Sequence, residues 1–483
     1  MRVLIGVCTS ALLLGAAPAH ADPGAGDSLA QRAEAAAAQA RIAARVSSAQ
    51  VNATAAFLIP LRINNPRIGR SFGFDVVDSK TGESVYSTSA NTALRPASNM
   101  KIVTALTALK VLGPSTRMAT STFVPKRGKV ILRGGGDTML TSSSLASLAR
   151  STAAYLTSNR LRPGRRQPPA YRPSTCTING KTRKSTTKRP CPLVTPPKKR
   201  KAVKVFVDDS LYRKPSRGPG WTSSYQPSVV RPVRPLGRIG VYQWDSAKEA
   251  GAVFASALRS AGLKARIRGH RDVTEGTPEA ASVDSSTVAS QVRYMLQVSE
   301  NNIAEMLFRQ VAVERGRKGS WKGGRLAARD TLRELGLSTK SLKLLDGSGV
   351  SRDDRLTPRF LTDLLAVALR TDEHPEFESF LKSLPVGGRT GTLSPSTARF
   401  TTYPSRCAAG EVFAKTGTLF DTIGLSGYTR AADGELKIFS ALVNDRPQSY
   451  SPLSTRQAVD GLIATVNGCW GPTKKTGNPP PLD

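Results

Sequence analysis

The chain has 483 residues, which exceeds one ordinary domain and predicts two or three. Hydrophobic residues make up 39% of it, enough to bury real cores, so the composition excludes an intrinsically disordered protein. The formal net charge of +35 favours contact with polyanions.

The first 21 residues are typical of a secretory signal peptide. Arg2 is followed by an almost continuous apolar run, 3–17, and Ala19-His20-Ala21 fits a small-x-small cleavage site. We therefore expect cleavage after Ala21 and a secreted, extracytoplasmic protein. The alternative is an uncleaved membrane anchor. No later segment has the ~18 uninterrupted apolar residues of a membrane helix.

The predicted elements, in chain order, alternate between strands and helices. A helix is expected at 28–50, a β-hairpin at 73–78 and 84–86, and an apolar helix at 98–112. In the middle, strands are expected at 129–133, 203–207 and 265–267, and helices at 246–261, 286–298 and 303–314. Near the end, strands are expected at 411–419, 425–429 and 436–443, with a helix at 456–466 and a disordered tail at 471–483. This order predicts one α/β (α+β) domain from 22–113 and 283–470, with an inserted accessory region at 114–282.

A basic, Pro-rich segment, 160–204, lies within that inserted region. No Asp or Glu occurs between Asp137 and Asp208. In an exported protein such a field favours anionic cell-wall polymers or a membrane surface. The segment has only Tyr171 as an aromatic residue, so base stacking has little to use and we expect no nucleic-acid partner. A solvated loop without a specific partner is the alternative.

The cysteines predict disulfides, because Cys8 leaves with the signal peptide and the remaining four lie in an oxidising compartment. Four cysteines allow three pairings. We favour Cys176–Cys191 and Cys407–Cys469, because each pair falls within one region of the chain. No Cys-x-x-Cys motif or histidine cluster occurs, so we expect neither a metal nor another cofactor.

Ser98 is the candidate nucleophile. It opens the most apolar helix, and Lys101 lies one turn later on the same face, where burial would lower its pKa. Ser185 and Ser379 also have a lysine three residues on, but neither begins a buried helix. His270 and His374 lie in polar, turn-like contexts and are expected at the surface, so the base of a serine enzyme would not be histidine.

Two further motifs follow in order along the chain. Ser299 and Asn301 can face one site only if the chain bends between the helices on either side. In Lys415-Thr416-Gly417-Thr418, a lysine beside a hydroxyl suits a substrate carboxylate, and the glycine lets a substrate backbone come close. Arg389-Thr390-Gly391-Thr392 has similar letters and is expected to be a loop near the site.

The order Ser-x-x-Lys, Ser-x-Asn, Lys-Thr-Gly resembles that of the penicillin-recognising serine enzymes. The run 346–352, Asp-Gly-Ser-Gly-Val-Ser-Arg, is similar to a signature of the D-alanyl-D-alanine carboxypeptidase/endopeptidases, which are class C low-molecular-mass penicillin-binding proteins. The resemblance extends from about Phe72 to Trp470. It also accounts for a large insertion between the first two motifs. Two features depart from the family pattern: Glu300 replaces the usual Asp or Asn, and 160–204 matches no family feature.

The resemblance implies a transpeptidase-like fold, an antiparallel sheet covered by helices on both faces. It implies that Ser98 attacks the bond between two D-alanines of a peptidoglycan stem peptide, with Lys101 as base. Ser299 would pass a proton to the leaving amine, and Asn301 would orient Lys101. Substrate contacts would come from Lys415, Thr416, Gly417 and Thr418, and the backbone N–H groups of Ser98 and Thr418 would form the oxyanion hole.

The same chemistry implies that β-lactams acylate Ser98 as covalent inhibitors. Two alternatives stay open at this point. One is a secreted serine β-lactamase or esterase, against which the long insertion argues. The other is a non-catalytic wall-binding protein that uses the basic segment to dock.

Overall fold

The computed structural model describes residues 47–469. The predicted signal peptide 1–21, the predicted tail 471–483 and most of the predicted helix 28–50 lie outside the described residues. The prediction ends a helix at residue 50, whereas in the structure a helix begins at Ser48. Helix α2 (Ser48–Ile63) is capped by Ser47, whose hydroxyl accepts a hydrogen bond from the Gln50 backbone N–H at 3.3 Å.

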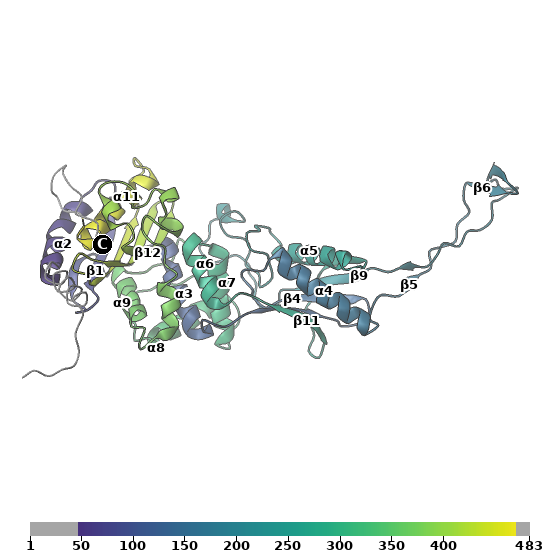
Figure 1. Cartoon of the computed structure of the whole chain (residues 1–483), viewed down its shortest axis with the longest axis horizontal. Helices are drawn as coiled ribbons and strands as arrows, with labels where there is room; N and C mark the ends of the chain where they lie inside the picture. Colours follow the sequence, from purple (N-terminus) through teal and green to yellow (C-terminus); the bar gives the residue numbers. More distant parts are fainter. Residues whose placement is uncertain (1–46, 470–483) are drawn as a thin grey trace, which may run out of the picture. The chain divides into compact units, whose positions relative to one another are not determined.

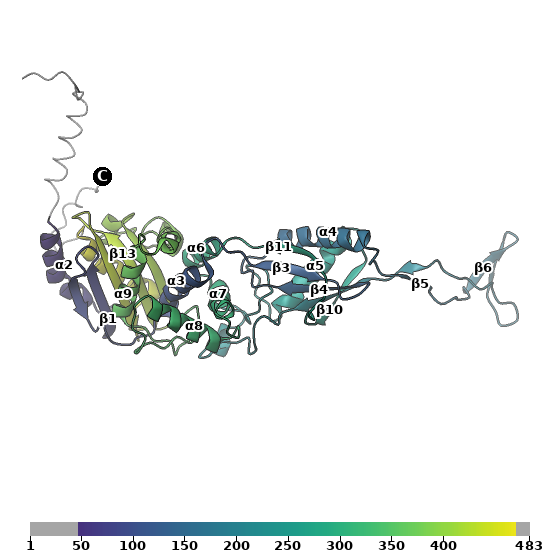
Figure 2. The same ribbon diagram turned by 90° about the horizontal axis from the view of Figure 1, so that it is seen from below.

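The first sheet is antiparallel, with the strand order β12-β13-β14-β1-β2 (Figures 1 and 2). Its strands are β1 (Ser71–Asp78), β2 (Ser84–Thr88), β12 (Val412–Leu419), β13 (Thr422–Arg430) and β14 (Leu436–Asn444). Side chains alternate between the two faces. Phe439 and Ala441 of β14 pack with α2 and with α11 (Pro452–Asn467), whereas Ile438 and Leu442 face the helices of the largest core. The antiparallel sheet with helices on both faces confirms the predicted fold.

The largest core surrounds α3 (Met100–Leu112), whose side chains are almost all buried. The helices packed in this core are α6 (Val288–Val298), α7 (Asn301–Glu314), α8 (Trp321–Glu334), α9 (Pro358–Leu369) and the short α10 (Glu378–Leu381). Helix α9 also lies against β1 and β14. An apolar helix between other helices and the sheet holds whatever sits at its N-terminus in a fixed place.

The second sheet has the order β10-β9-β4-β3-β11. Its strands are β3 (Ala119–Phe123), β4 (Lys129–Gly134), β9 (Val203–Asp208), β10 (Ala265–His270) and β11 (Glu279–Asp284). Strands β4, β9 and β10 run parallel, β3 pairs antiparallel with β4, and β11 pairs antiparallel with β3 at the edge of the sheet. Helices α4 (Ser142–Ser158) and α5 (Ser246–Ser260) share a third apolar core with these strands. Every strand of this sheet comes from between the first and second sequence motifs.

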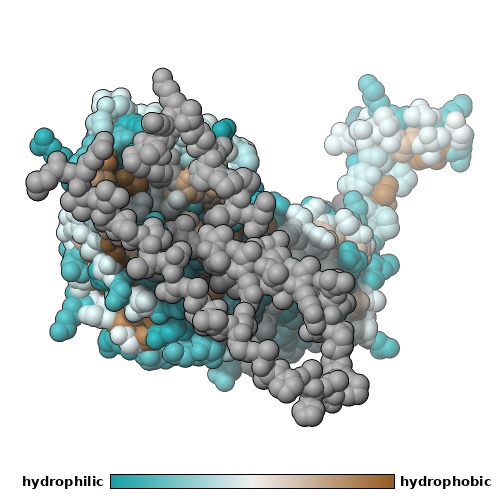
Figure 3. Space-filling view, turned by 60° about the vertical axis from the view of Figure 1, so that its left-hand side comes forward, coloured by the Kyte–Doolittle hydropathy of each residue, from teal (hydrophilic) through white to brown (hydrophobic). Residues whose placement is uncertain are grey.

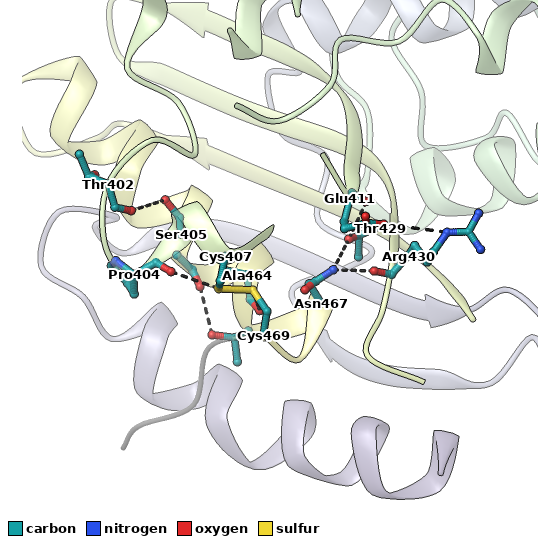
Figure 4. The surroundings of a disulfide bond; sticks show 12 residues. Thr402, Pro404, Ser405, Cys407, Glu411, Thr429, Arg430, Ala464, Asn467 and Cys469 are labelled. Atoms are coloured by element: carbon teal, nitrogen blue, oxygen red, sulfur yellow. Dashed lines mark hydrogen bonds and ion pairs between the residues drawn. A yellow bond between two sulfur atoms is a disulfide. The ribbon is translucent and has the colours of Figure 1, made fainter. Parts of the chain in front are cut away.

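Both predicted disulfides are present. Cys176 and Cys191 join within the basic segment, with an S–S distance of 2.07 Å. Cys407 and Cys469 tie the 3₁₀ turn Ser405–Ala408 to the end of α11 (Figure 4). Near that end, the Asn467 side-chain amide donates to Thr429 Oγ1 at 3.0 Å, which fixes α11 to strand β13. The C-terminal helix is thereby held to the 3₁₀ turn by the disulfide and to the first sheet by Asn467.

The predicted hairpin, the apolar helix, the late strands and the helices that flank Ser299 are all confirmed. Elements that the sequence analysis missed include α2, α4, α8, α9, β3 and β11. Several of these elements have sequences that indicate a helix only weakly: α4 is rich in Ser, Ala and Thr, and α8 contains Gly323 and Gly324. On the face drawn in Figure 3, the described surface is mainly hydrophilic with scattered apolar residues. Within 47–469, no helix is long and apolar enough to span a membrane.

Candidate active site

Ser98 lies in a tight turn at the start of α3. The 3₁₀ turn Ala97–Asn99 precedes the helix, and Ala97 has a φ of 46°, which is unusual for a residue with a Cβ. Gly349 approaches this turn closely and has a φ of 78°. A Cβ at Gly349 would lie 1.8 Å from the Ala97 carbonyl oxygen, so only glycine fits there. The Asp346–Arg352 signature therefore packs directly against the turn that presents Ser98.

Lys101 is fully buried and has three polar partners. Its Nζ lies 2.9 Å from Ser98 Oγ, 2.7 Å from Asn301 Oδ1 and 2.9 Å from the Ser348 carbonyl oxygen. Burial lowers the Lys101 pKa to about 8, although the negative charges of Asp346, Glu300 and Glu305 oppose the shift. A substantial fraction of this amine is therefore neutral near pH 8, and a neutral amine can take the Ser98 proton.

The chain bends at Ser299, as the sequence analysis required. Helix α6 ends there in a left-handed conformation with a φ of 58°. Helix α7 begins two residues later, capped by Glu300, whose carboxylate accepts the Ile303 backbone N–H at 2.6 Å. As a result Asn301 contacts Lys101 at 2.7 Å while Ser299 contacts Lys415. The Glu300 carboxylate also accepts from the Tyr242 hydroxyl at 2.9 Å.

Strand β12 brings the third motif to the same place. Lys415 is fully buried, and its Nζ donates to Ser299 Oγ at 3.0 Å and to the Thr416 carbonyl at 2.8 Å. Burial, together with the positive charges of Lys101 and Arg399, holds the Lys415 pKa well below its usual range. An anion placed beside this amine would raise that pKa again and would be bound by it. Gly417 passes so close to the Ser98 turn that a Cβ would lie 2.9 Å from the Pro96 carbonyl oxygen.

The structure thus brings the three motifs together through contacts between Ser98, Lys101 and Asn301 and between Ser299 and Lys415. Thr416 is buried and Thr418 is exposed on the same strand. The competing serines lie elsewhere: Ser185 Oγ accepts from the Cys191 backbone N–H at 3.0 Å, and Ser379 Oγ donates to the Glu376 carbonyl. Their lysines, Lys188 and Lys382, are exposed and lack the burial that lowers the Lys101 pKa.

Three groups at the site were not assigned from sequence. The first is the Ser348 carbonyl. Its motif, 346–352, was identified in the sequence, but no role was assigned to this carbonyl. The second is Glu305, which is fully buried and accepts the backbone N–H groups of Gly347 at 3.2 Å and Ser348 at 2.8 Å. Glu305 thereby aims the Ser348 carbonyl at Lys101, and burial raises its own pKa. The sequence offered one signal for Glu305, which is an acidic residue within the helix predicted at 303–314.

The third group is Thr392, in the loop that the sequence analysis expected near the site. Its Oγ1 accepts a hydrogen bond from Thr416 Oγ1 at 2.8 Å, which confirms that expectation. Asn301 has a second partner outside the motifs, because its Nδ2 donates to the Val229 carbonyl at 2.9 Å. Asn301 is therefore held at both ends of its amide, with its oxygen directed to Lys101.

The two histidines contact residues outside the three motifs. His270 is partly exposed, and its ring nitrogens contact Asp209 at 3.0 Å and Asp245 at 2.9 Å. His374 packs against Phe377 with ring centroids 5.3 Å apart. Among residues 47–469, no group of three or more His, Cys, Asp or Glu side chains could hold a metal ion.

Comparison with known proteins places this geometry in a family. The profile of the D-Ala-D-Ala carboxypeptidase 3 (S13) family matches residues 59–155 and 233–466. The intervening stretch, 156–232, includes the basic segment that matched no family feature in the sequence analysis. The two matched segments contain Ser98, Lys101, Ser299, Asn301 and the Lys415–Thr418 motif.

Curated relatives and solved structures agree with the profile. The chain is 28% identical over 420 residues to the carboxypeptidase DacB of Mycolicibacterium smegmatis, covering 84% of this chain and 82% of that protein. It is 29% identical over 490 residues to a D-alanyl-D-alanine carboxypeptidase of Actinomadura sp. (strain R39), covering 88% of each. Its fold is similar to penicillin-binding protein 4 (dacB) of Haemophilus influenzae, with a TM-score of 0.65, 18% identity and coverage of 85% and 98%. The chain therefore belongs to the D-Ala-D-Ala carboxypeptidase 3 (S13) family and is a peptidase.

Proposed function

We propose that the protein is a serine-type D-Ala-D-Ala carboxypeptidase/endopeptidase that acts on peptidoglycan stem peptides through an acyl-enzyme on Ser98. The observation that carries the proposal is the set of contacts around Lys101 Nζ, which joins Ser98 Oγ, Asn301 Oδ1 and the Ser348 carbonyl within 2.9 Å. A serine hydroxyl is a weak nucleophile that needs an adjacent base, and a buried amine of lowered pKa meets that need.

In the proposed acylation, neutral Lys101 takes the Ser98 proton as Oγ attacks the carbonyl carbon between two D-alanines. The negative charge that develops on the carbonyl oxygen is stabilised by the backbone N–H groups of Ser98 and Thr418. Collapse of the tetrahedral intermediate breaks the C–N bond. The proton that Lys101 took is delivered to the leaving D-alanine amine through Ser299, whose hydroxyl contacts Lys415 at 3.0 Å. Water then attacks the ester carbonyl, the bond to Ser98 Oγ breaks, and the protons of the water are shared between the two products, the shortened peptide acid and the restored Ser98 hydroxyl.

The substrate carboxylate is assigned to the third motif. Lys415 and Thr416 present an amine and a hydroxyl from the buried part of β12, and Thr418 lies at its exposed end. A carboxylate is the ligand that such donors prefer. Gly417 lets the peptide backbone lie along the strand. This arrangement favours peptides that end in a free carboxylate over internal peptide bonds.

Benzylpenicillin and other β-lactams are proposed as covalent inhibitors that acylate Ser98. They carry a reactive amide and a carboxylate, which match the two halves of the site. The penicillin-binding protein 4 of Haemophilus influenzae has been crystallised in complex with a β-lactam, in a structure with a TM-score of 0.60 to this chain. A secreted β-lactamase is disfavoured by the family match, which is to carboxypeptidases.

We also propose that the protein works outside the cytoplasm, after removal of the signal peptide 1–21. The two disulfides support this location, because such bonds persist in oxidising compartments. For the domain division, we propose a catalytic domain of 22–113 and 283–470 and an inserted accessory region of 114–282. The strand content of the two sheets supports it. The first sheet takes no strand from 114–282, whereas the second takes four strands and most of β11 (Glu279–Asp284) from there.

Product analysis tests the proposed reaction. Incubation with a synthetic stem pentapeptide ending in D-Ala-D-Ala is expected to release one D-alanine per peptide, whereas the L-Ala-L-Ala analogue stays intact. A cross-linked muropeptide dimer, measured in parallel, assesses the endopeptidase part. Failure to cleave either D-Ala-containing substrate, combined with rapid turnover of benzylpenicillin, would contradict the proposal and support the β-lactamase alternative.

A further inference from the structure

The basic segment, residues 160–204, holds its shape without an apolar core. Among residues 47–469, the three buried apolar clusters take no residue from 163–202. Order comes instead from two short antiparallel ladders, β5 (Arg165–Arg166) with β8 (Lys199–Arg200) and β6 (Thr175–Ile178) with β7 (Lys181–Lys184). The Cys176–Cys191 disulfide closes this part of the chain. A cross-link in place of a core keeps polar residues in fixed positions at the surface.

The ladders place like charges opposite each other. Arg165 pairs with Arg200, and Arg166 with Lys199. Like charges directly across a strand pair destabilise it. The segment contains 15 Lys and Arg residues and no Asp or Glu. Within the described part of the chain, none of the cations between 160 and 201 forms an ion pair with a carboxylate from elsewhere. The guanidinium groups of Arg162, Arg172 and Arg183 donate hydrogen bonds to neutral oxygens, such as the Cys191 carbonyl for Arg172 at 2.7 Å.

This uncompensated repulsion points to an anionic ligand. An external polyanion would neutralise charges that the fold itself leaves unpaired, and the release of counterions would add to affinity. All four side chains of the β5–β8 ladder are exposed, so such a ligand can reach them. The stretch also lies outside the two segments that match the family profile, so a role there adds to the family reaction and does not repeat it.

The register favours a flexible chain over a flat membrane. Successive side chains of a strand point to opposite faces. The Arg165–Arg200 pair therefore lies on one face of its ribbon and the Arg166–Lys199 pair on the other. The β6–β7 ribbon also has cations on both faces, since Lys181 and Lys184 are three residues apart. A planar lipid surface contacts one face only, whereas a flexible polymer can contact both.

We infer that the basic segment binds a linear, flexible cell-wall polymer that carries repeated phosphate or carboxylate groups. Nucleic acid is the less suited polyanion, because Tyr171 is the only aromatic side chain available for base stacking in the segment. The inference rests on the proposed function only for the location of the protein at the wall. Binding would hold the peptidase at its insoluble substrate and raise the local concentration of stem peptides.

The test compares two quadruple variants of the full chain with equal net charge. The first is R165Q/R166Q/K199Q/R200Q in the ladder. The control is K318Q/K322Q/K340Q/K343Q, which removes four exposed lysines from outside the segment. Binding to fluorescent poly(glycerol phosphate) and to polygalacturonate is measured by anisotropy at 50 and 200 mM NaCl. Phosphatidylglycerol vesicles and a 20-base-pair DNA duplex serve as rival ligands.

For the wild type we expect affinity for one or both polymers to fall roughly 50-fold between the two salt concentrations, as about four phosphate contacts would give. The ladder variant should bind at least tenfold more weakly at 50 mM NaCl, and the control variant within twofold of the wild type. Equal losses in both variants would reduce the effect to net charge and overturn the inference. Tighter binding per phosphate to vesicles or DNA would overturn the assignment to a wall polymer.

D-alanine release from the soluble pentapeptide is measured on the same samples. The ladder variant should retain wild-type release, because none of its four residues contacts the site of Ser98. Loss of release in every sample would count against the proposed peptidase function and leave the binding comparison intact. The two proposals can therefore fail separately.

Discussion

Replacement of Lys101 by methionine is expected to slow acylation by benzylpenicillin by about 10³-fold. A positioned general base contributes roughly 10²–10⁴ to the rate, and methionine fills the buried space without offering a base. Stopped-flow measurement with a fluorescent penicillin gives the rate constant directly. In the wild type that rate constant should rise as pH increases through about 8, because the buried Lys101 amine becomes neutral above its pKa. The variant should lack this rise.

The matched control is Lys110→Met on the same helix. Lys110 lies near the other end of α3, where its amine pairs with Glu376 at 2.8 Å. Its replacement should leave the acylation rate within twofold of the wild type. Melting temperatures of both variants show whether the fold survives. A folded Lys101→Met protein that acylates within threefold of the wild type would exclude Lys101 as the base.

Replacement of Lys415 by methionine is expected to lower kcat/KM for a D-Ala-D-Ala peptide by about 10²-fold. Loss of a hydrogen bond to a charged group costs about 1.5–3 kcal/mol, which corresponds to a factor of roughly 10–150. The comparison that isolates this effect uses two substrates, the natural peptide acid and the same peptide with a C-terminal amide. The amide cannot form the ion pair, so the wild type and the variant should hydrolyse it at rates within about threefold.

One outcome of the two-substrate comparison would contradict a role of Lys415 in binding the carboxylate. If the variant loses the same factor on the acid and on the amide, Lys415 acts on the acylation step or on the position of Ser299, not on the carboxylate. The Lys415 Nζ to Ser299 Oγ contact of 3.0 Å makes this a real distinction. Wild-type discrimination between acid and amide, lost in the variant, would support the carboxylate role.

The order of elements could be predicted where apolar periodicity was strong. Helix α3 and strands β12 to β14 carry nearly continuous apolar patterns, and these were placed within a few residues. The bend at Ser299 could be predicted from helix geometry, because residues at i and i+2 do not share a helix face, yet Ser299 and Asn301 had to face one site. Helix α2 was missed because it contains Pro60, a residue that disfavours a helix interior, and α8 because two glycines weaken its helical preference.

The candidate site could be predicted only as far as its side chains form recognisable local motifs. The Ser348 carbonyl belongs to the backbone, and no residue type marks it as a partner of Lys101. Glu305 has no motif of its own; its effect comes from tertiary contacts with Gly347 and Ser348, 42 and 43 residues later in the chain. The close approach of Gly349 to Ala97 is likewise a property of two distant segments, which only their packing brings together.

The central claim is that Ser98 is the residue that becomes acylated. Benzylpenicillin is incubated with the wild type and with Ser98→Ala, and tryptic peptides are analysed by mass spectrometry with fragmentation. The peptide that spans 81–101 also contains Ser84, Ser87 and Ser89, so fragmentation must place the adduct. We expect one penicilloyl group on Ser98 and none in Ser98→Ala. An adduct on another residue, or one that persists in Ser98→Ala, would contradict the claim.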